Sequence, residues 1–441
     1  MRNFVSYVIV MLCLSIMQSC AVKKRTDWLY AMGQDSLLNR ANYGLKIMDM
    51  DKGTTLYSLN SNRFFIPASN TKLWTMYAGL QTFGDSIPGW SIAEDDKHIY
   101  LEPNGDPTFL NDEFPEQRVF ELLKNSHKSL QLVLPENTAF GRFGSGWSWG
   151  TWQETYSPER SVMPIYNNMV RFYKEGNNFK AIPSFFNNLI EPPKDDDLRA
   201  AYSSVLRAET SNSYKVQKNS NRNSWIRPFT RLDNDTLAYM LLSDTLGRTN
   251  SKVRMSIVHN KPDNLIFSPV YTVATDTLFA KLMKRSDNFF AEQMMLMAGK
   301  IRYGAFADFG TISKLREDLF DGILDQGKWV DGSGLSRGNL ISPEEFVKLL
   351  TVIYKGKDFE RVKRILPHGN QGTLQGLYVG YEANIWAKTG TLADHLGLSG
   401  YLKTKKGNNL AFSFLINNFR GNASDYRRKM EEILIWIIEC L

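Results

Sequence analysis

The chain has 441 residues, of which 43% are hydrophobic and 12% aromatic, enough to build more than one hydrophobic core. Its mean hydropathy of -0.33 argues against a polytopic membrane protein. The net charge of +7 comes from Lys and Arg residues spread along the chain beside Asp and Glu, which indicates a solvated mixed surface rather than a nucleic-acid groove. We therefore expect two or three globular domains and no nucleic-acid partner.

The first twenty residues, MRNFVSYVIVMLCLSIMQSC, combine an early Arg with an apolar run that is too short for a lone spanning helix. This pattern predicts an export signal over residues 1–19. Ser19 stands directly before Cys20, and this end resembles the lipobox of bacterial lipoproteins, in which the cysteine after the cleavage site carries a lipid. The alternative is an ordinary signal peptide with an incidental cysteine. Beyond this segment Cys440 is alone, so no intramolecular disulfide is expected.

The next elements are a helix, a hairpin and a second helix. An apolar stripe predicts a helix over 26–40, and two alternating runs around the turn at 51–53 predict a hairpin. Apolar residues at spacings of three and four then predict an amphipathic helix that begins at Ser69 and ends at Gly84.

From 86 to 265 the character of the sequence changes. Short strand-like runs alternate with clusters of turn residues, which predicts a mostly β insertion. One aromatic-rich stretch within it, FGSGWSWGTWQETYSPER, contains Trp147, Trp149 and Trp152. We expect these rings to pack in a core or between domains, and stacking on sugar rings is the alternative.

Helical periodicity returns near 274 and breaks at residues 286–288. Three strands follow between 383 and 419, and an apolar stripe closes the chain as a helix. Because strands and a helix occur at both chain ends, we expect one sheet built from both. The predicted fold class is α/β (α+β), with a core over 26–85 and 266–441 that is interrupted by the insertion over 86–265.

Ser69 and Lys72 form a Ser-x-x-Lys pattern at the start of a predicted helix. Side chains three residues apart leave the same helix face, so a hydroxyl and an amine lie side by side. Free backbone N–H groups and the helix dipole favour a developing negative charge at this position. Apolar neighbours are expected to lower the pKa of Lys72 toward a value useful for a base. Alone, the pattern also arises by chance in a chain of this length.

Two further patterns carry polar side chains that could take part in catalysis or substrate binding. Ser286-x-Asn288 lies in the loop between two predicted helices, where capping of the second helix is the alternative explanation. Lys388-Thr389-Gly390 ends a predicted strand, where Gly390 allows another backbone or a ligand to approach closely. The side chains of Lys388 and Thr389 suit a carboxylate, although a simple turn would use the same residues.

The three patterns occur in the order and on the elements typical of penicillin-binding proteins and serine β-lactamases. The chain also resembles one branch of that superfamily, the class C low-molecular-mass penicillin-binding proteins of the D-alanyl-D-alanine carboxypeptidase/endopeptidase type. Three stretches carry this resemblance: NGDPTF (104–109), DGSGLSRGNLISP (331–343) and LSGYLKT (398–404). It covers nearly the whole mature chain and implies an antiparallel sheet flanked by helices, the serine β-lactamase/DD-peptidase-like core.

The resemblance implies roles at the matched positions. Ser69 would attack the carbonyl of the penultimate D-Ala, and Lys72 would accept the serine proton. Ser286 would relay that proton to the leaving nitrogen, while Asn288 would hold Lys72 or a substrate amide. The backbone N–H groups of Ser69 and Thr391 are the implied oxyanion hole.

Substrate contacts are implied at the end of the motif strand. Lys388 and Thr389, in the Lys-Thr-Gly stretch with Gly390, would bind the terminal carboxylate together with Thr391. Arg337 is a candidate for a second substrate carboxylate, with a salt bridge beside the site as the alternative.

The implied partners are peptidoglycan peptides and β-lactams, in a periplasm where the protein is anchored to a membrane through a lipid on Cys20. No cofactor is expected, and the five His residues show no metal-binding spacing, which argues against a zinc peptidase. The sequence carries no signal for an oligomeric state. The alternatives are a serine β-lactamase or esterase on the same fold, or a catalytically silent peptidoglycan-binding homologue.

Overall fold

The computed structural model describes residues 32, 34–135, 138–176, 178–191, 205–216, 223–231 and 235–441. The predicted export signal, Cys20 and most of the helix predicted over 26–40 lie outside these residues. None of the helices in the described part of the chain combines the length and the hydrophobicity needed to cross a bilayer.

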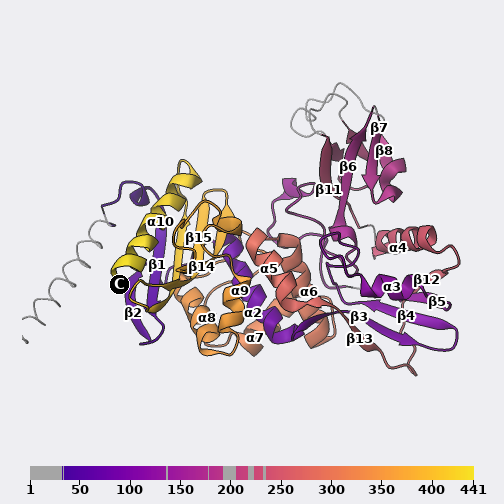
Figure 1. Cartoon of the computed structure of the whole chain (residues 1–441), viewed down its shortest axis with the longest axis horizontal. Coiled ribbons are helices and arrows are strands. Elements are labelled where there is room, and N and C mark those ends of the chain that lie inside the picture. Colours follow the sequence, from indigo (N-terminus) through magenta and orange to yellow (C-terminus); the bar gives the residue numbers. More distant parts are fainter. Residues whose placement is uncertain are drawn as a thin grey trace, which may run out of the picture.

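Both ends of the chain build one antiparallel sheet of five strands (Figure 1). The order across the sheet is β14 (Ile385–Leu392), β15 (His395–Lys403), β16 (Asn409–Asn417), β1 (Asn42–Asp49) and β2 (Thr54–Leu59). The central strands are buried on both faces, so their side chains form near-continuous apolar runs rather than an alternation. The predicted antiparallel sheet built from both ends is confirmed.

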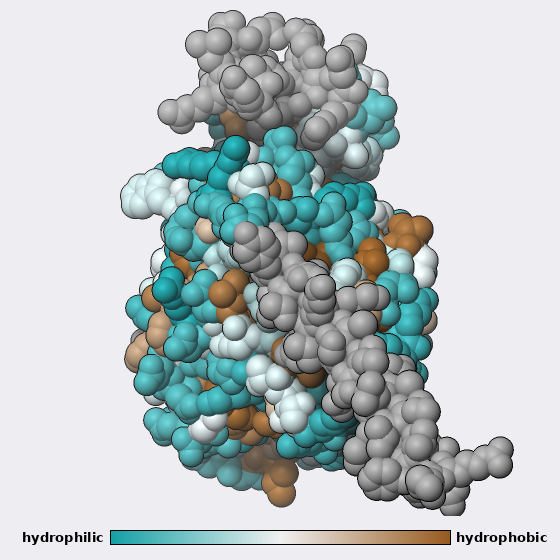
Figure 2. Space-filling view, turned by 90° about the vertical axis from the view of Figure 1, so that its left-hand side faces the viewer, coloured by the Kyte–Doolittle hydropathy of each residue, from teal (hydrophilic) through white to brown (hydrophobic). Residues whose placement is uncertain are grey.

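The C-terminal helix α10 (Ala423–Cys440) covers one face of this sheet. Its apolar stripe, which includes Ile433, Leu434 and Ile437, is buried against β15 and β16 residues such as Leu398 and Phe414. Figure 2 views the molecule from this end, where the uncovered surface is mostly hydrophilic and hydrophobic residues occur in small separate groups. The apolar side of α10 therefore points inward.

A layer of helices covers the other face of the sheet and continues away from it (Figure 1). It consists of α2 (Lys72–Phe83), α5 (Thr275–Arg285), α6 (Asn288–Tyr303), α7 (Phe309–Leu319), α8 (Pro343–Lys355) and α9 (Phe359–Ile365). Helix α2 is central, and its Trp74 ring is fully buried with its centroid 5.1 Å from that of Phe320. The predicted end of this helix is confirmed, because Gly84 adopts a φ of 67° that favours glycine.

The inserted region lies on the far side of the helix layer from α10 (Figure 1). Its main sheet has the order β12 (Met255–Val258), β5 (Ser129–Val133), β4 (His98–Pro103), β3 (Ser86–Glu94) and β13 (Ser268–Ala274). Two smaller sheets have the orders β11 (Ser224–Pro228), β6 (Met169–Glu175), β7 (Asn178–Ile182) and β8 (Ile190–Glu191), β10 (Tyr214–Val216), β9 (Val205–Arg207). Helices α3 (Arg118–Lys124) and α4 (Thr236–Thr249) pack into a hydrophobic core shared with these sheets.

The predicted boundary between insertion and second core segment, at 265/266, is placed too early. Strand β13 (Ser268–Ala274) pairs with β3 and so belongs to the sheet of the insertion. The core resumes at Thr275, the first residue of α5. An extended segment shows its strand character locally, but the strand that pairs with it lies far away in sequence. With this change, the division into core and insertion stays a prediction.

Leu434 tests whether α10 is an integral part of the core. Leu434→Ala should lower the free energy of unfolding by about 2–5 kcal/mol, because it leaves a cavity between α10 and the sheet. Glu432→Ala, on the exposed side of the same helix, loses one surface ion pair and should change it by at most about 1 kcal/mol. Urea unfolding followed by tryptophan fluorescence measures both, and equal losses in the two variants would contradict the packing described here.

Candidate active site

Ser69 lies in a tight turn that leads into α2. The turn is a 3-10 helix, Ala68–Thr71, and the α-helix itself begins at Lys72, three residues later than predicted. Ala68 has a φ of 48°, in the left-handed region that residues with a Cβ rarely adopt. Strain of this kind clusters at functional sites, and it presents the partly exposed Ser69 at the tip of the turn.

The ammonium of Lys72 is fully buried beneath Ser69 and donates three hydrogen bonds. The acceptors are Ser69 Oγ at 2.9 Å, Asn288 Oδ1 at 2.6 Å and the Ser333 carbonyl at 2.6 Å. Asn288 begins α6 and Ser333 lies in the loop before α8, so three separate parts of the chain converge on one nitrogen. The structure therefore brings together Ser69, Lys72 and Asn288, as the motifs predict.

Burial lowers the pKa of Lys72 to about 8, because desolvation disfavours the charged form. The negative charges of Asp331, Asp287 and Glu292 oppose this shift and keep it from being larger. A neutral amine is therefore available near neutral pH, within hydrogen-bonding distance of a serine hydroxyl. That combination is the requirement for a nucleophile with its own base.

The loop between α5 and α6 leaves Ser286 and Asn288 free for the site. Ser286 ends α5 in the left-handed conformation, with a φ of 61°. The cap of α6 is Asp287, whose side chain accepts a hydrogen bond from the Phe290 backbone. The capping explanation therefore applies to the residue between the two motif positions. Both motif side chains point to lysines instead, Asn288 to Lys72 and Ser286 to Lys388.

The Lys-Thr-Gly residues lie within strand β14, not in a turn. Lys388 is buried, and its Nζ donates to Ser286 Oγ at 2.9 Å and to the Thr389 carbonyl at 2.7 Å. Burial, and secondly the charge of Lys72, hold the pKa of Lys388 well below its usual value. A Cβ on Gly390 would lie 2.4 Å from the Pro67 carbonyl oxygen. Glycine is thus what lets the motif strand pack against the turn that carries the serine.

Polar side chains line the end of the motif strand. Thr389 is half-buried and Thr391 is exposed. Arg427, near the start of α10, donates to Thr391 Oγ1 at 3.0 Å. The exposed Arg337 donates to the Ala393 carbonyl at 3.3 Å, so a backbone contact takes the place of the salt bridge considered as its alternative.

Two further groups at this site have no recognisable signal in the sequence. The Ser333 carbonyl is a backbone group, and no residue type signals its role. Arg427 was missed because only the packing of α10 on the sheet brings it to the motif strand; its position on the polar side of a helix pattern gave no indication of this.

The arrangement can perform nucleophilic acyl transfer. It offers a serine hydroxyl, a buried amine that can accept its proton, and a second lysine beside a strand end that suits a carboxylate. Such a combination is typical of serine hydrolases that form an acyl-enzyme.

The chain belongs to the D-Ala-D-Ala carboxypeptidase 3 (S13) family, whose sequence pattern matches residues 27–438. It is 26% identical over 447 residues to a D-alanyl-D-alanine carboxypeptidase of Actinomadura sp. (strain R39), covering 89% of this chain and 81% of the relative. It is 24% identical over 436 residues to penicillin-sensitive carboxypeptidase A of Dictyostelium discoideum, covering 87% and 83%. In structure it is similar to penicillin-binding protein 4 of Haemophilus influenzae, with a TM-score of 0.74 and 19% identity over 91% of this chain and 98% of that one.

These similarities confirm the predicted class. The chain is a serine peptidase of the D-Ala-D-Ala carboxypeptidase family, with the mixed α/β fold of the class C penicillin-binding proteins. The roles of individual residues remain predictions, which the geometry makes specific.

If Lys72 accepts the Ser69 proton, acylation by a chromogenic β-lactam should become faster as pH rises through about 8. Below that pH the ammonium form of Lys72 dominates and cannot act as a base; above it the neutral amine dominates. Stopped-flow measurement at subsaturating β-lactam gives the profile. Lys72→Arg should be slow at every pH, since a guanidinium stays protonated. A wild-type rate that falls from about pH 6 to about pH 9 would contradict this role.

Proposed function

We propose that this chain is an exported serine D-Ala-D-Ala carboxypeptidase/endopeptidase that cleaves peptidoglycan peptides through an acyl-enzyme on Ser69. The observation that supports it most is the 2.9 Å hydrogen bond between Ser69 Oγ and the fully buried Lys72 Nζ, in a chain of the S13 family. A surface Ser-Lys pair would keep its lysine charged, and an ammonium cannot remove a proton.

Acylation begins when Ser69 Oγ attacks the carbonyl of the penultimate D-Ala, while Lys72 Nζ takes the hydroxyl proton. The backbone N–H groups of Ser69 and Thr391 stabilise the oxyanion. Lys388 donates to Ser286 Oγ, so the hydroxyl proton of Ser286 is free to pass to the leaving nitrogen, while Ser286 takes up in its place the proton that Lys72 received from Ser69. The C–N bond then breaks, the ester forms, and water hydrolyses it in a second round of the same steps.

Substrate recognition uses the end of the motif strand. The terminal carboxylate binds beside Lys388, Thr389 and Thr391, with Arg427 holding the Thr391 hydroxyl. A bound carboxylate favours the charged form of Lys388, which raises its pKa from the low value that burial imposes. Lys388 thus becomes a full cation when substrate is present. Arg337, exposed at the same end, is placed to bind a second carboxylate of a peptide.

The same acylation step serves two substrates. The leaving nitrogen belongs to a free D-Ala in a carboxypeptidase reaction and to a cross-linked neighbouring peptide in an endopeptidase reaction. Both products leave from the partly exposed side of Ser69, and the insertion sets the access of the larger leaving group. Penicillin mimics the acyl donor and acylates the same serine, in keeping with the penicillin-sensitive relative.

Mass spectrometry tests the nucleophile directly. After incubation with penicillin, the intact mass of the protein should increase by one adduct, which peptide mapping should place on Ser69. Ser69→Ala should show no adduct and lower D-Ala release from a pentapeptide by at least about 10⁴-fold. Ser424→Ala, an exposed serine on α10, serves as the control and should behave as wild type. An adduct on another residue would refute the assignment, and rapid β-lactam turnover without a lasting adduct would favour the β-lactamase alternative.

Export and lipid anchoring form a separate part of the proposal, supported by the sequence of residues 1–20. If the chain is exported and lipidated on Cys20, the full-length protein should fractionate with the membranes of an expressing bacterium and incorporate labelled fatty acid. Cys20→Ser should abolish the label, because a serine has no thiol to carry the lipid. A labelled Cys20→Ser variant would contradict the lipobox.

A further inference from the structure

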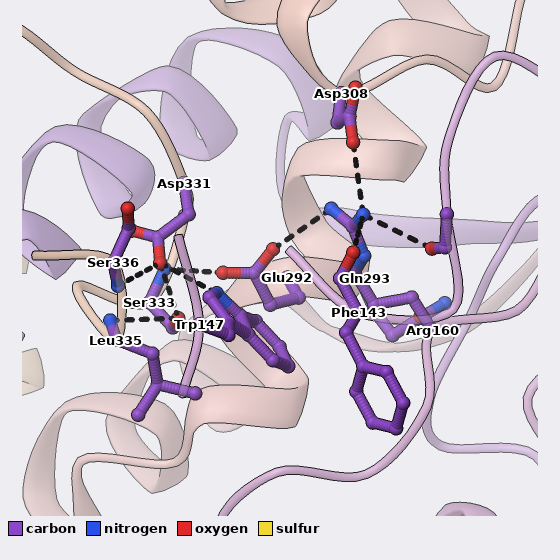
Figure 3. A network of polar contacts seen from close by, with 12 residues as sticks. Phe143, Trp147, Arg160, Glu292, Gln293, Asp308, Asp331, Ser333, Leu335 and Ser336 are labelled. Carbon is purple, nitrogen blue, oxygen red and sulfur yellow. Dashed lines mark hydrogen bonds and ion pairs between the residues drawn. The ribbon is translucent and has the colours of Figure 1, made fainter. Parts of the chain in front are cut away.

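A segment of the insertion, residues 141–160, enters the core beside α6; we refer to it as the docking segment. Its last residue, Arg160, is only 2% exposed. The guanidinium donates to Glu292 of α6 at 3.3 Å and to Asp308 at 2.9 Å, as well as to two carbonyls of the docking segment itself (Figure 3). Removing one partner from a buried ion pair leaves an uncompensated charge, so this contact fixes the segment strongly.

A second contact joins the docking segment to the loop before α8. Trp147 Nε1 donates to Asp331 Oδ2 at 2.9 Å (Figure 3). The same oxygen accepts from the Ser336 backbone at 2.6 Å, and Oδ1 accepts from the Gly334 backbone at 2.8 Å. Asp331 thereby organises the loop that contains Ser333, and the indole of Trp147 closes its hydrogen-bonding shell.

Both contacts lead to Lys72. Glu292 Oε1 accepts from the Ser333 backbone N–H at 2.7 Å, and the carbonyl of Ser333 accepts from Lys72 Nζ at 2.6 Å. The docking segment also reaches the Ser-x-Asn motif, because the Tyr156 carbonyl accepts from Asn288 Nδ2 at 2.8 Å. This bond orients the amide so that Oδ1 faces Lys72. Two of the three acceptors around the Lys72 nitrogen are thus held by the insertion.

We propose that the docking segment positions Lys72, with Arg160 and Trp147 as positioning residues, so that the core is a competent acylating enzyme only when the insertion is docked. This inference rests on the proposed role of Lys72. None of the positioning groups touches the reacting atoms; they act through the Ser333 carbonyl and the Asn288 amide. Misplacing a catalytic group by about 1 Å can cost about 10²-fold in rate, so their effect on acylation is large.

The network also predicts how removal of Arg160 changes the pKa of Lys72. The charged groups that influence Lys72 are Asp287 and Glu292 of α6, Asp331 of the loop and Lys388 of β14. Burial and the nearby Asp331 raise the pKa of Glu292 to about 7, and Arg160 opposes that rise. Loss of Arg160 removes that opposing charge and so favours the neutral form of Glu292. A neutral Glu292 would no longer raise the pKa of Lys72, and the pKa of Lys72 is then expected to fall.

Arg160→Met, compared with Lys300→Met, tests the positioning role. Lys300, near the other end of α6 and away from Lys72, also forms an ion pair with the insertion, to Glu102 at 2.7 Å. Arg160→Met should lower the plateau rate of penicillin acylation by about 10- to 100-fold and move the pH midpoint below that of wild type. Lys300→Met should keep both the midpoint and a rate within about twofold of wild type. If Arg160→Met only destabilised the fold, the fraction of active protein, measured by adduct stoichiometry, would fall. The pH midpoint of the acylation rate would then stay unchanged.

Trp147→Phe keeps the inference testable if Arg160→Met does not fold. This variant keeps an aromatic ring for packing and leaves the Arg160–Glu292 ion pair intact, but it removes the donor to Asp331. Its rate of penicillin acylation should fall about tenfold. Rates and midpoints equal to those of Lys300→Met would overturn the positioning role. The wild type provides the separate check: no adduct on Ser69 would refute the proposed function itself, whereas an adduct with unaffected variants would refute only this inference.

Discussion

The burial of the Lys72 amine is the constraint on which the rest of the site depends. An ammonium taken out of water is costly unless acceptors replace its hydration, and here three acceptors do so from the serine turn, α6 and the loop before α8. These parts of the chain are far apart in sequence. The core fold therefore has to be complete before Lys72 can be buried and its pKa lowered, which ties the basicity of one side chain to the packing of the whole helix layer.

A second buried lysine makes the site a coupled system. Lys388 lies beside Ser286, and the charge of Lys72 lowers the pKa of Lys388 in addition to burial. Two interacting groups of this kind titrate as a pair, so each proton that one gains disfavours a proton on the other. A substrate carboxylate bound near Lys388, as proposed, would favour the charged form of that lysine.

The sequence predicted what short-range patterns encode. The helix that ends at Gly84, the hairpin of β1 and β2, and the strand character of Lys388-Thr389-Gly390 all follow from local periodicity and turn residues. What it could not predict depends on contacts distant in sequence. Strand β13 joined the wrong unit because its partner, β3, is about 180 residues away. The Ser333 carbonyl and Arg427 were missed for the same reason, since neither a backbone group nor a surface arginine signals which neighbour it will meet.

The attachment of the insertion explains why a separate docking contact matters. The chain leaves the core after α2 and returns at α5, and these two points are adjacent, with the Thr275 backbone donating to the Asp85 carbonyl at 3.0 Å. Two neighbouring crossings alone would act as a hinge. The buried contacts of Arg160 and Trp147 lie elsewhere on α6 and the loop before α8, and together with other contacts such as Lys300–Glu102 they restrain that hinge. Glu292 and Asp331, the partners in these contacts, also act on the pKa of Lys72, so under the proposed role of Lys72 the orientation of the insertion and the competence of the base depend on the same contacts.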